Sequence, residues 1–262
     1  MIQIIQKQFI AIFLLCVATI DAQFALPTFQ AAHKPHDSNY VLNLNGTNEY
    51  AYYADNSNFE PDSWSIQAWI DPAAVPTNSN NDFFIHKNKT YRLGLEYTAS
   101  GVEVMGSLRW SGDNYNVNSG DQNFYVTTGG GWYHVVLTFD GTNLVLYVNG
   151  DEKDTNSNSS YSTTDQNGVF SIGRRDDTGT LYYNGKIDEV TLWNSALSAN
   201  AVTALYNSGS GLSASTNSGN YTSSSNLVLY LKMEQNLEDS ANSYDFTGNN
   251  ISSEYYGNTD YE

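Results

Sequence analysis

Cysteine is almost absent from this 262-residue sequence. Cys16 is the only one, and it lies inside the N-terminal hydrophobic segment. Exported proteins with small cores often depend on disulfides, and this chain cannot form one within itself. About 240 residues follow that segment, enough for one all-β sandwich with its own hydrophobic core. We therefore expect packing, not cross-linking, to stabilise the fold.

Basic residues are also scarce. Eleven Lys and Arg stand against 28 Asp and Glu, which gives a formal net charge of −17. The adjacent basic pair Arg174-Arg175 is followed at once by Asp176 and Asp177. Nucleic acids and anionic membranes require clustered Lys or Arg, so we expect neither as a partner. The acidity is typical of a soluble surface protein, and calcium binding is the alternative explanation.

Long hydrophobic runs are missing, apart from one near the N-terminus. Residues 9–20 are apolar except for Thr19, whereas a membrane span needs about 20 residues. A polar segment with Lys7 precedes this run, and Ala22 follows it as a small residue at a cleavage point. This order predicts a signal peptide over residues 1–22, of bacterial appearance, and hence a secreted or cell-surface protein with no membrane span. An uncut hydrophobic anchor is the alternative.

The rest of the chain favours β-structure. A polar linker over residues 23–38 precedes short runs of aromatic and β-branched residues, separated by Gly, Asn, Asp and Ser. Asp140-Gly141 between two apolar runs is a strong hairpin signal. One short helix is expected over Ala199–Asn207, capped by Ser198 and stopped by Gly209. Predicted strands cover residues 40–45, 49–54, 64–71, 83–87, 91–97, 102–110, 132–139, 143–149, 169–174, 186–193 and 227–233.

Four segments stand out in order along the chain: residues 42–50 with 64–70, residues 132–136 with 139–141 and 146–150, residues 172–174, and residues 185–190 with 192–194 and 196–198. In order and spacing they resemble the laminin G-like, concanavalin A-like jelly-roll family. The resemblance covers about residues 40–210. It implies an all-β antiparallel sandwich with one short helix, and we place the domain at residues 39–249.

The C-terminal part contains a strand that the resemblance would place at the start of the domain. Residues 227–234, followed by Glu238 and Asp239, are similar to the opening strand of the family. Either the domain is circularly permuted and this strand completes the sandwich, or the strand begins a second copy. The tail over residues 250–262 shows no pattern.

Catalytic motifs of this sandwich are not found. Its glycosidases place two carboxylates on one face of a strand, but Asp188 and Glu189 are adjacent and point to opposite faces. His134 lies between apolar residues of a predicted strand, and the resemblance implies a structural role with a hydrogen bond inside the sandwich. We therefore expect no enzyme activity.

Calcium is the candidate metal, with a structural role. Asp188 offers a carboxylate, and the turn formed by Asn45, Gly46 and Asn48 offers backbone carbonyls, which are ligands that Ca²⁺ prefers. The alternative is that Asp188 accepts backbone N–H groups of that turn. A second acidic loop contains Asp239, Asn242 and Asp245.

Carbohydrate contact requires an aromatic face beside amide or carboxylate groups. Trp110, Asp113, Asn114 and Tyr115 offer this mixture at a strand end. Other aromatic candidates are Tyr52, Tyr53, Tyr182 and Tyr183.

These observations lead to a non-catalytic carbohydrate-binding or adhesion module outside the cell as the main hypothesis. Its partner would be an extracellular glycan or a surface protein. A structural or protein-interaction part of a larger adhesin or filament is the alternative, and a glycoside hydrolase or hydrolase-attached module is the third.

Overall fold

The computed structural model describes residues 40–77, 81–110, 113–163, 167–176, 180–251 and 256–258. The predicted signal peptide over residues 1–22 and the linker over residues 23–38 lie outside this range. Within it, no helix combines the length and apolarity needed to cross a membrane.

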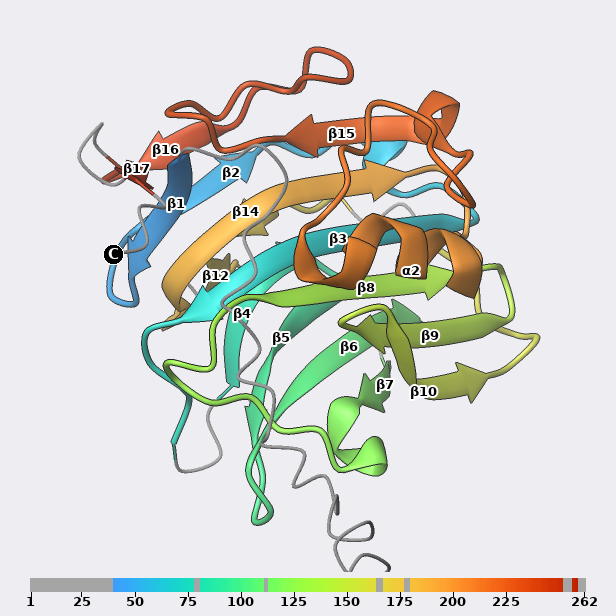
Figure 1. Cartoon of the computed structure of the whole chain (residues 1–262), viewed down its shortest axis with the longest axis horizontal. Helices are drawn as coiled ribbons and strands as arrows, with labels where there is room; N and C mark the ends of the chain where they lie inside the picture. Colours follow the sequence, from blue (N-terminus) through green and yellow to red (C-terminus); the bar gives the residue numbers. More distant parts are fainter. Residues whose placement is uncertain are drawn as a thin grey trace, which may run out of the picture. The chain divides into compact units, whose positions relative to one another are not determined.

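Two sheets, named A and B here, form a sandwich and confirm the predicted fold class (Figure 1). Among the described residues, sheet A has eight strands. Its order is β10 (Asp151–Ser157), β9 (Asn143–Val148), β8 (Tyr133–Phe139), β3 (Trp64–Pro72), β14 (Asn184–Trp193), β1 (Tyr40–Asn45) and β17 (Tyr256–Asn258), with β15 (Leu227–Leu231) also paired to β14.

Sheet B has nine strands in the same part of the chain. Its order is β16 (Thr247–Asn249), β2 (Tyr50–Tyr53), β11 (Phe170–Ile172), β4 (Asn81–Lys87), β5 (Tyr91–Tyr97), β6 (Val102–Trp110) and β7 (Asp113–Asn118), with β12 (Arg174–Arg175) paired to β13 (Thr180–Tyr182) and β13 to β4. The contact of β13 with β4 is parallel, and the other strand pairs are antiparallel.

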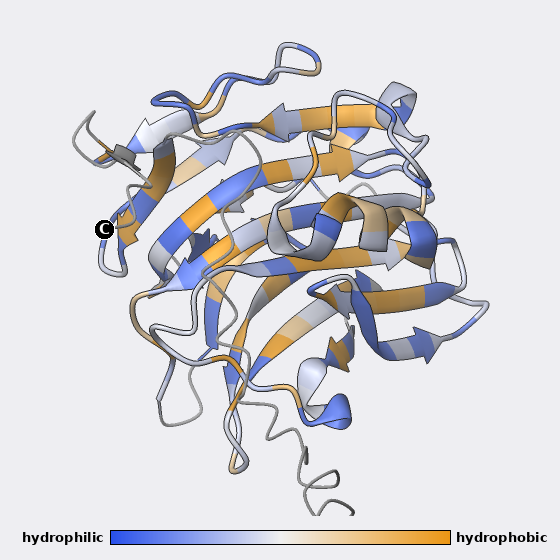
Figure 2. Ribbon diagram, viewed as in Figure 1, coloured by the Kyte–Doolittle hydropathy of each residue, from blue (hydrophilic) through white to orange (hydrophobic). Residues whose placement is uncertain are grey.

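The core lies between the sheets and follows the alternation of the strands. In β3, Trp64, Ile66 and Ile70 are fully buried in this core. The opposite face of β3 is buried as well, because α2 (Ala199–Tyr206) lies across sheet A (Figures 1 and 2). The middle of the outer face of sheet A is therefore covered by the protein itself.

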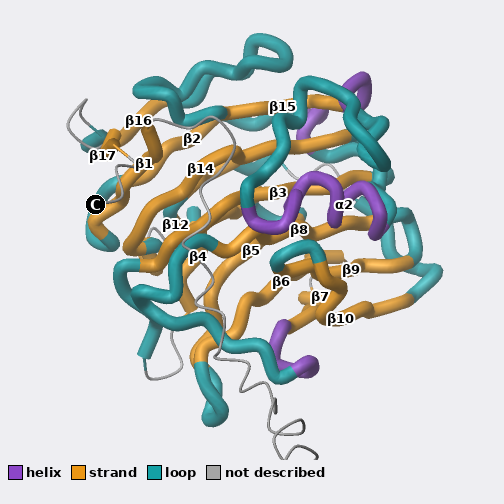
Figure 3. Tube along the Cα trace, in the orientation of Figure 1, coloured by secondary structure: helices purple, strands orange, loops and turns teal. Residues whose placement is uncertain are grey.

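Helix α2 begins as predicted, because the Ser198 side chain accepts a hydrogen bond from the Ala201 N–H. The predicted stop at Gly209 is wrong. The helix ends at Tyr206, and Asn207 closes it in the left-handed conformation at φ 48°. Asn tolerates this region better than most residues. A 3₁₀ turn, η3 (Asn207–Gly209), and a long loop lead on towards η4 (Ser224–Asn226) and β15 (Figure 3).

Two edge strands, β7 and β10, are not among the predicted strands. The sequence of β10 is polar throughout, and β7 has only two apolar residues, Tyr115 and Val117, between polar ones. They meet at one end of the sandwich. The Asp154 carboxylate on β10 accepts the Asn118 N–H at 3.0 Å, and the Asn156 amide donates to the Asn116 carbonyl at 3.2 Å. Side chains of one edge strand thus satisfy backbone groups of the other.

The C-terminal strand belongs to this sandwich. β15 pairs with β14 at Val190↔Leu231, and β1 pairs with an earlier part of β14 at Leu42↔Ile187. The tail prediction of no pattern is wrong for residues 256–258, which form β17 beside β1. This strand has only three residues, too few for a readable pattern.

Candidate functional site

The outer face of sheet B carries one continuous row of side chains, named the central row here. Directly paired residues of seven neighbouring strands form it. The members are Thr247, Tyr52, Ser171, His86, Arg92, Ser107 and Asn116. Since the alternate residues of these strands fill the core, the central row faces away from it.

One half of this face is rich in cations. His86 and Arg92 are direct partners, Ser107 follows on β6, and Arg109 stands two residues further along that strand. These side chains, with Lys89 and Asn114, line a small pocket with a volume of about 10 Å³. We call this the cationic pocket.

The orientation of His86 follows from its hydrogen bond. Its Nδ1 accepts the Asp176 N–H at 3.2 Å, so in the neutral ring Nε2 carries the proton and is a donor.

Two buried hydroxyls of the central row have no hydrogen-bond partner in the described structure. Ser107 is 1 % exposed and Ser171 is fully buried, and neither Oγ reaches an acceptor or donor. A buried polar atom without a partner carries a free-energy cost, and such atoms are uncommon in native proteins. Ser107 also lines the cationic pocket, so a ligand there would gain a hydrogen bond that the protein leaves unmade.

Aromatic rings fix the arginines. Phe83 is buried under this face, with the guanidinium carbons of Arg92 and Arg175 at 5.2 Å and 5.8 Å from its ring centroid. Such cation–π contacts stabilise a planar cation over a ring and limit its motion.

The other half of the face is aromatic. Tyr50 lies 5.8 Å from Tyr52 and 6.2 Å from Tyr182 between ring centroids, and all three rings are half-buried. The guanidinium carbon of Arg174 is 3.5 Å from the Tyr50 centroid, while its Nη2 contacts Asp176 at 2.7 Å. We call Tyr50, Tyr52 and Tyr182 the tyrosine platform.

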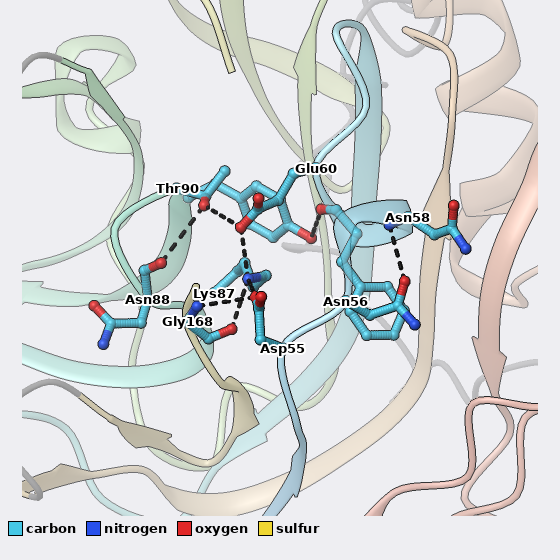
Figure 4. Close-up of polar contacts among 10 residues, drawn as sticks. Asp55, Asn56, Asn58, Glu60, Lys87, Asn88, Thr90 and Gly168 are labelled. Carbon is cyan, nitrogen blue, oxygen red and sulfur yellow. Dashed lines mark hydrogen bonds and ion pairs between the residues drawn. The ribbon is translucent and has the colours of Figure 1, made fainter. Parts of the chain in front are cut away.

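A buried ion cluster (Figure 4) includes Lys87 and Thr90, which also line the cationic pocket. The Lys87 ammonium is fully buried, 2.7 Å from Asp55 Oδ1 and 2.5 Å from Glu60 Oε1, and it donates to the Gly168 carbonyl at 2.6 Å. The Thr90 hydroxyl donates to Glu60 at 2.9 Å. This cluster lowers the pKa of Asp55, chiefly through the hydrogen bond from Lys87.

The ion cluster connects three chain segments beside the cationic pocket. Asp55 and Glu60 belong to the segment after β2, Gly168 precedes β11, and Lys87 and Thr90 flank the β4–β5 turn. Three separate segments are thus joined at the end of β4. That turn carries Lys89 and leads directly to Arg92.

The predicted carbohydrate residues do not form one group. Asn114 is exposed and lines the cationic pocket. Tyr115 packs towards the core, with its ring centroid 4.2 Å from that of Tyr161. The backbones of Trp110 and Asp113 pair with each other, and their side chains lie outside the described residues.

The other tyrosine candidates divide in the same way. Tyr52 and Tyr182 lie in the tyrosine platform, whereas Tyr183 is fully buried in the core and Tyr53 packs against it. The sequence places each pair side by side, and strand alternation separates them.

The predicted calcium ligands are not brought together either. Asn45 pairs with Asn184, four residues before Asp188 on β14, which corresponds to about 13 Å along a strand. The turn is closed by its own side chains, since Glu49 accepts the Asn45 N–H at 2.7 Å and Asn45 Oδ1 accepts those of Thr47 and Asn48. These residues do not fit a shared metal ion.

Asp188 itself is fully buried, and its Oδ1 accepts the Glu189 N–H at 2.9 Å. The alternative that it accepts N–H groups of the Asn45–Asn48 turn therefore fails for the same geometric reason. In the chain segments that the structure covers, no cluster of three or more His, Cys, Asp or Glu side chains has metal-binding geometry.

The second acidic loop is organised by one carboxylate. Asp239 accepts the backbone N–H groups of Tyr230, Ala241, Asn242 and Tyr244 at 2.8–3.2 Å. Asp245 in turn accepts the Asp239 N–H. Both oxygens of Asp239 are used within the protein, so the loop is a structural element of this region.

His134 has the structural position that the resemblance implies. It is fully buried, its Nε2 is 2.8 Å from Gln67 Oε1, and its ring packs against both Trp69 and Tyr206. Burial lowers the pKa of His134 to about 3.

A second depression, of about 380 Å³, lies between η1 (Ser57–Phe59) and the start of β15. Asn58, Asn194, Asn242 and Tyr244 are among its lining residues, and none of the residues described around it is charged. The Asn242 amide donates to the Val228 carbonyl, and the Asn58 amide donates to the Tyr244 hydroxyl. Its polar groups are therefore engaged with one another.

The fold has counterparts among solved structures. A crystal structure from Bacteroides ovatus, described as a "putative carbohydrate binding protein", is 20 % identical with a TM-score of 0.60. The match covers 82 % of this chain and 59 % of that one, so this chain spans about three fifths of its relative.

Two further structures are similar at lower scores. Domain 4 of AbnA, an extracellular arabinanase from Geobacillus stearothermophilus, is 23 % identical over 63 % of this chain and 75 % of that one, with a TM-score of 0.47. The sialidase CBM40 of Ruminococcus gnavus is 17 % identical over 63 % and 96 %, also at 0.47.

No curated protein matches the sequence significantly. A family model does match, that of the concanavalin A-like lectin/glucanases superfamily, over residues 45–203. This range is more than half of the chain and contains most of both sheets. The chain therefore belongs to the concanavalin A-like lectin/glucanases superfamily.

Proposed function

We propose that this protein is an exported, non-catalytic carbohydrate-binding module, and that it binds its ligand on the outer face of sheet B. The observation that carries the proposal is the central row. It joins the tyrosine platform to the cationic pocket on one surface. Sugar rings stack on aromatic faces, and their hydroxyls bind to amide, hydroxyl and guanidinium groups.

Other observations agree with this choice of face. The middle of the outer face of sheet A is covered by α2, and Lys89 and Asn114 beside the cationic pocket are exposed. The Bacteroides ovatus protein with the same fold is described as carbohydrate-binding in its own name.

The test is calorimetric titration of the purified protein with a panel of polysaccharides. We expect Tyr52→Ala to weaken binding at least tenfold, because a stacking surface is lost. Tyr97→Ala is the matched control, since Tyr97 is 42 % exposed at the far end of β5 and outside the central row. Equal binding by both variants would reject this face as the site.

The absence of catalysis needs a separate measurement. Glu96 and Glu103 are direct partners on β5 and β6 and so form a pair of carboxylates on neighbouring strands. We expect no release of reducing sugar from any polysaccharide that binds. Release that disappears in Glu96→Gln or Glu103→Gln would establish a hydrolase instead.

Export is tested by determining the N-terminal residue of the protein recovered from outside the cell. Cleavage after Ala22 gives a mature chain that begins at Gln23. A full-length chain retained at the membrane would favour the uncut anchor.

A further inference from the structure

The uncharged depression between η1 and the start of β15 lies apart from the central row. Its volume of about 380 Å³ falls within the range of about 300–1,000 Å³ that is common for small-molecule sites. The residues described around it come from η1 and the segment after it, the residue that follows β14, the start of β15, and the loop between β15 and β16. Because three of these residues are Asn58, Asn194 and Asn242, we call this depression the asparagine pocket.

Two asparagine side chains of the pocket are held in place by the protein. The Asn242 amide donates to the Val228 carbonyl at 2.8 Å and to the Leu227 carbonyl at 3.3 Å. The Asn58 amide donates to the Tyr244 hydroxyl at 2.6 Å. Both asparagines are exposed, so these hydrogen bonds orient groups that solvent can reach.

These hydrogen bonds use only part of the capacity of each group. A carboxamide has two N–H donors and an acceptor oxygen, and a tyrosine hydroxyl both donates and accepts. The Asn194 oxygen accepts the Asn226 amide at 3.1 Å, and no described residue accepts from Asn194 Nδ2. In the same part of the chain, the oxygens of Asn58 and Asn242 have no donor and the Tyr244 hydroxyl proton has no acceptor. The pocket therefore offers both acceptor oxygens and donor groups.

The loop that carries two of these groups is fixed as well. Asp239 accepts the backbone N–H groups of Asn242 and Tyr244 at 3.0 Å and 3.2 Å. The Tyr244 ring packs against Phe59 and Tyr53, with ring centroids 5.0 Å and 5.7 Å apart. Groups positioned in advance lose less conformational entropy when a ligand binds, so this arrangement favours binding.

The chemistry of the pocket matches an uncharged sugar. None of the residues described around it is charged, so these residues supply no counter-ion for a charged ligand. Each sugar hydroxyl donates one hydrogen bond and accepts others, which suits carboxamides that present an oxygen beside N–H groups. Pro61, Leu227 and the Tyr244 ring add apolar surface for the C–H groups of a sugar ring.

We propose that the asparagine pocket is a second saccharide site, which binds one uncharged sugar unit. Asn58 and Asn242 accept hydrogen bonds from sugar hydroxyls, and Asn194 and Tyr244 donate to them. This inference goes beyond the proposed site on sheet B, because the ligand class follows from the groups of this pocket.

The experiment is an NMR titration of the purified, nitrogen-labelled protein with the methyl glycosides of glucose, galactose, mannose and arabinose. We expect at least one glycoside to shift the side-chain amide signals of Asn58, Asn194 and Asn242 in a saturable way. N-acetylglycinamide is the comparison probe, since it offers amide groups without hydroxyls, and we expect it to cause no such shifts.

The variants are Tyr244→Phe and Asn194→Ala, each of which removes one donor. We expect either change to weaken glycoside binding about three- to tenfold. Tyr97→Phe and Asn236→Ala are the matched controls, because they remove an exposed hydroxyl and an exposed amide outside the pocket. Tyr244→Phe keeps the ring and its core contacts, so it remains informative if Asn194→Ala folds poorly, which thermal melting would reveal.

The outcomes separate this site from the one on sheet B. Amide signals that no glycoside shifts, shifts that persist at equal affinity in both pocket variants, or equal shifts with N-acetylglycinamide would each overturn the asparagine pocket. Shifts that Tyr52→Ala abolishes would also overturn it and leave the site on sheet B in place. Shifts of the three asparagines in a protein whose polysaccharide binding does not depend on Tyr52 would support the pocket and reject the site on sheet B.

Discussion

The Lys87 ammonium lies 2.7 Å from Asp55 Oδ1 and is shielded completely from solvent. Its second partner, Glu60, has a side chain that is 1 % exposed, so two of the three charges of this cluster are buried. Removal of Lys87 would leave the Glu60 carboxylate without its counter-ion. A buried charge left in this way destabilises a protein by about 3–5 kcal/mol.

We therefore expect Lys87→Met to reduce the free energy of unfolding by about 3–5 kcal/mol, measured by urea denaturation. The matched control is Lys186→Met, whose ion pair with Asp71 is 3.5 Å long and half-exposed. Exposed pairs contribute below about 1 kcal/mol. Equal losses in the two variants would contradict a special role for the buried cluster.

The same cluster predicts that the stability of the protein decreases at low pH. Asp55 has a pKa below its ordinary 3.8 in the folded protein, because the Lys87 hydrogen bond stabilises the carboxylate. The unfolded chain therefore takes up a proton at higher pH than the folded one. This contribution to stability is complete above about pH 5 and is lost as the pH falls through the folded pKa.

Denaturation curves between pH 5 and pH 2.5 check this prediction. Asp55→Asn should be less stable than the parent at pH 6, and the difference should shrink towards pH 2.5. A difference that stays constant over this range would show that Asp55 does not titrate as proposed.

His134 gives a second pH effect in a different range. Burial lowers its pKa to about 3, against about 6.5 in an unfolded chain. Between these values the unfolded chain binds a proton that the folded protein does not, so stability falls as the pH decreases below about 6.5. Nitrogen and carbon NMR shifts of the His134 ring should remain those of the neutral form at pH 4.5. Shifts of a charged imidazolium at that pH would refute the prediction.

Tyr52 and Tyr53 are consecutive, yet they belong to different sides of sheet B. Tyr53 contacts Phe59, Tyr244 and Phe246 with ring centroids 5.5–5.7 Å apart. We expect Tyr53→Ala to lower stability by about 2–4 kcal/mol. Tyr52→Ala should reduce saccharide binding instead, with a loss below about 1 kcal/mol. Denaturation and calorimetry on both variants measure the two effects, and a reversed pattern would contradict the assignment of faces.

The main features of the fold could be predicted because they leave local traces in the sequence. The alternation of Trp64, Ile66, Ala68 and Ile70 predicted one face of β3, and the structure confirms that face in the core. Asp140-Gly141 predicted the hairpin between β8 and β9, which is observed. Edge strand β10 could not be found in this way, because its sequence is polar and has no buried apolar face. Strand β7 has only two apolar residues, Val117 in the core and Tyr115 packed against it, and this pattern is too short to stand out.

The site could be predicted only in small part. Asn114, Tyr52 and Tyr182 were named as candidates, but Arg92, Arg109, His86 and Ser107 were not. Their positions along the chain are unrelated, and only the register of β4, β5 and β6 makes them neighbours. The alternation along β5 could have indicated that Arg92 lies on the outer face, since it stands between the core residues Tyr91 and Leu93. Clustering of charges along the sequence does not reveal this group, because strand pairing brings cations from distant positions onto one face of the sheet.

The link between β7 and β10 has a consequence for how this protein behaves when crowded. A bare sheet edge offers backbone groups to which a strand of another molecule can add, and this addition starts fibrils. Here Asp154 and Asn156 already occupy the Asn118 N–H and the Asn116 carbonyl. On β10, Asp151 and Glu152 place negative charge along the outer strand, and a bulge between Glu152 and Asp154 breaks its regular pairing geometry. The acidic side chains and the bulge therefore disfavour the addition of a strand from a neighbouring copy at this edge.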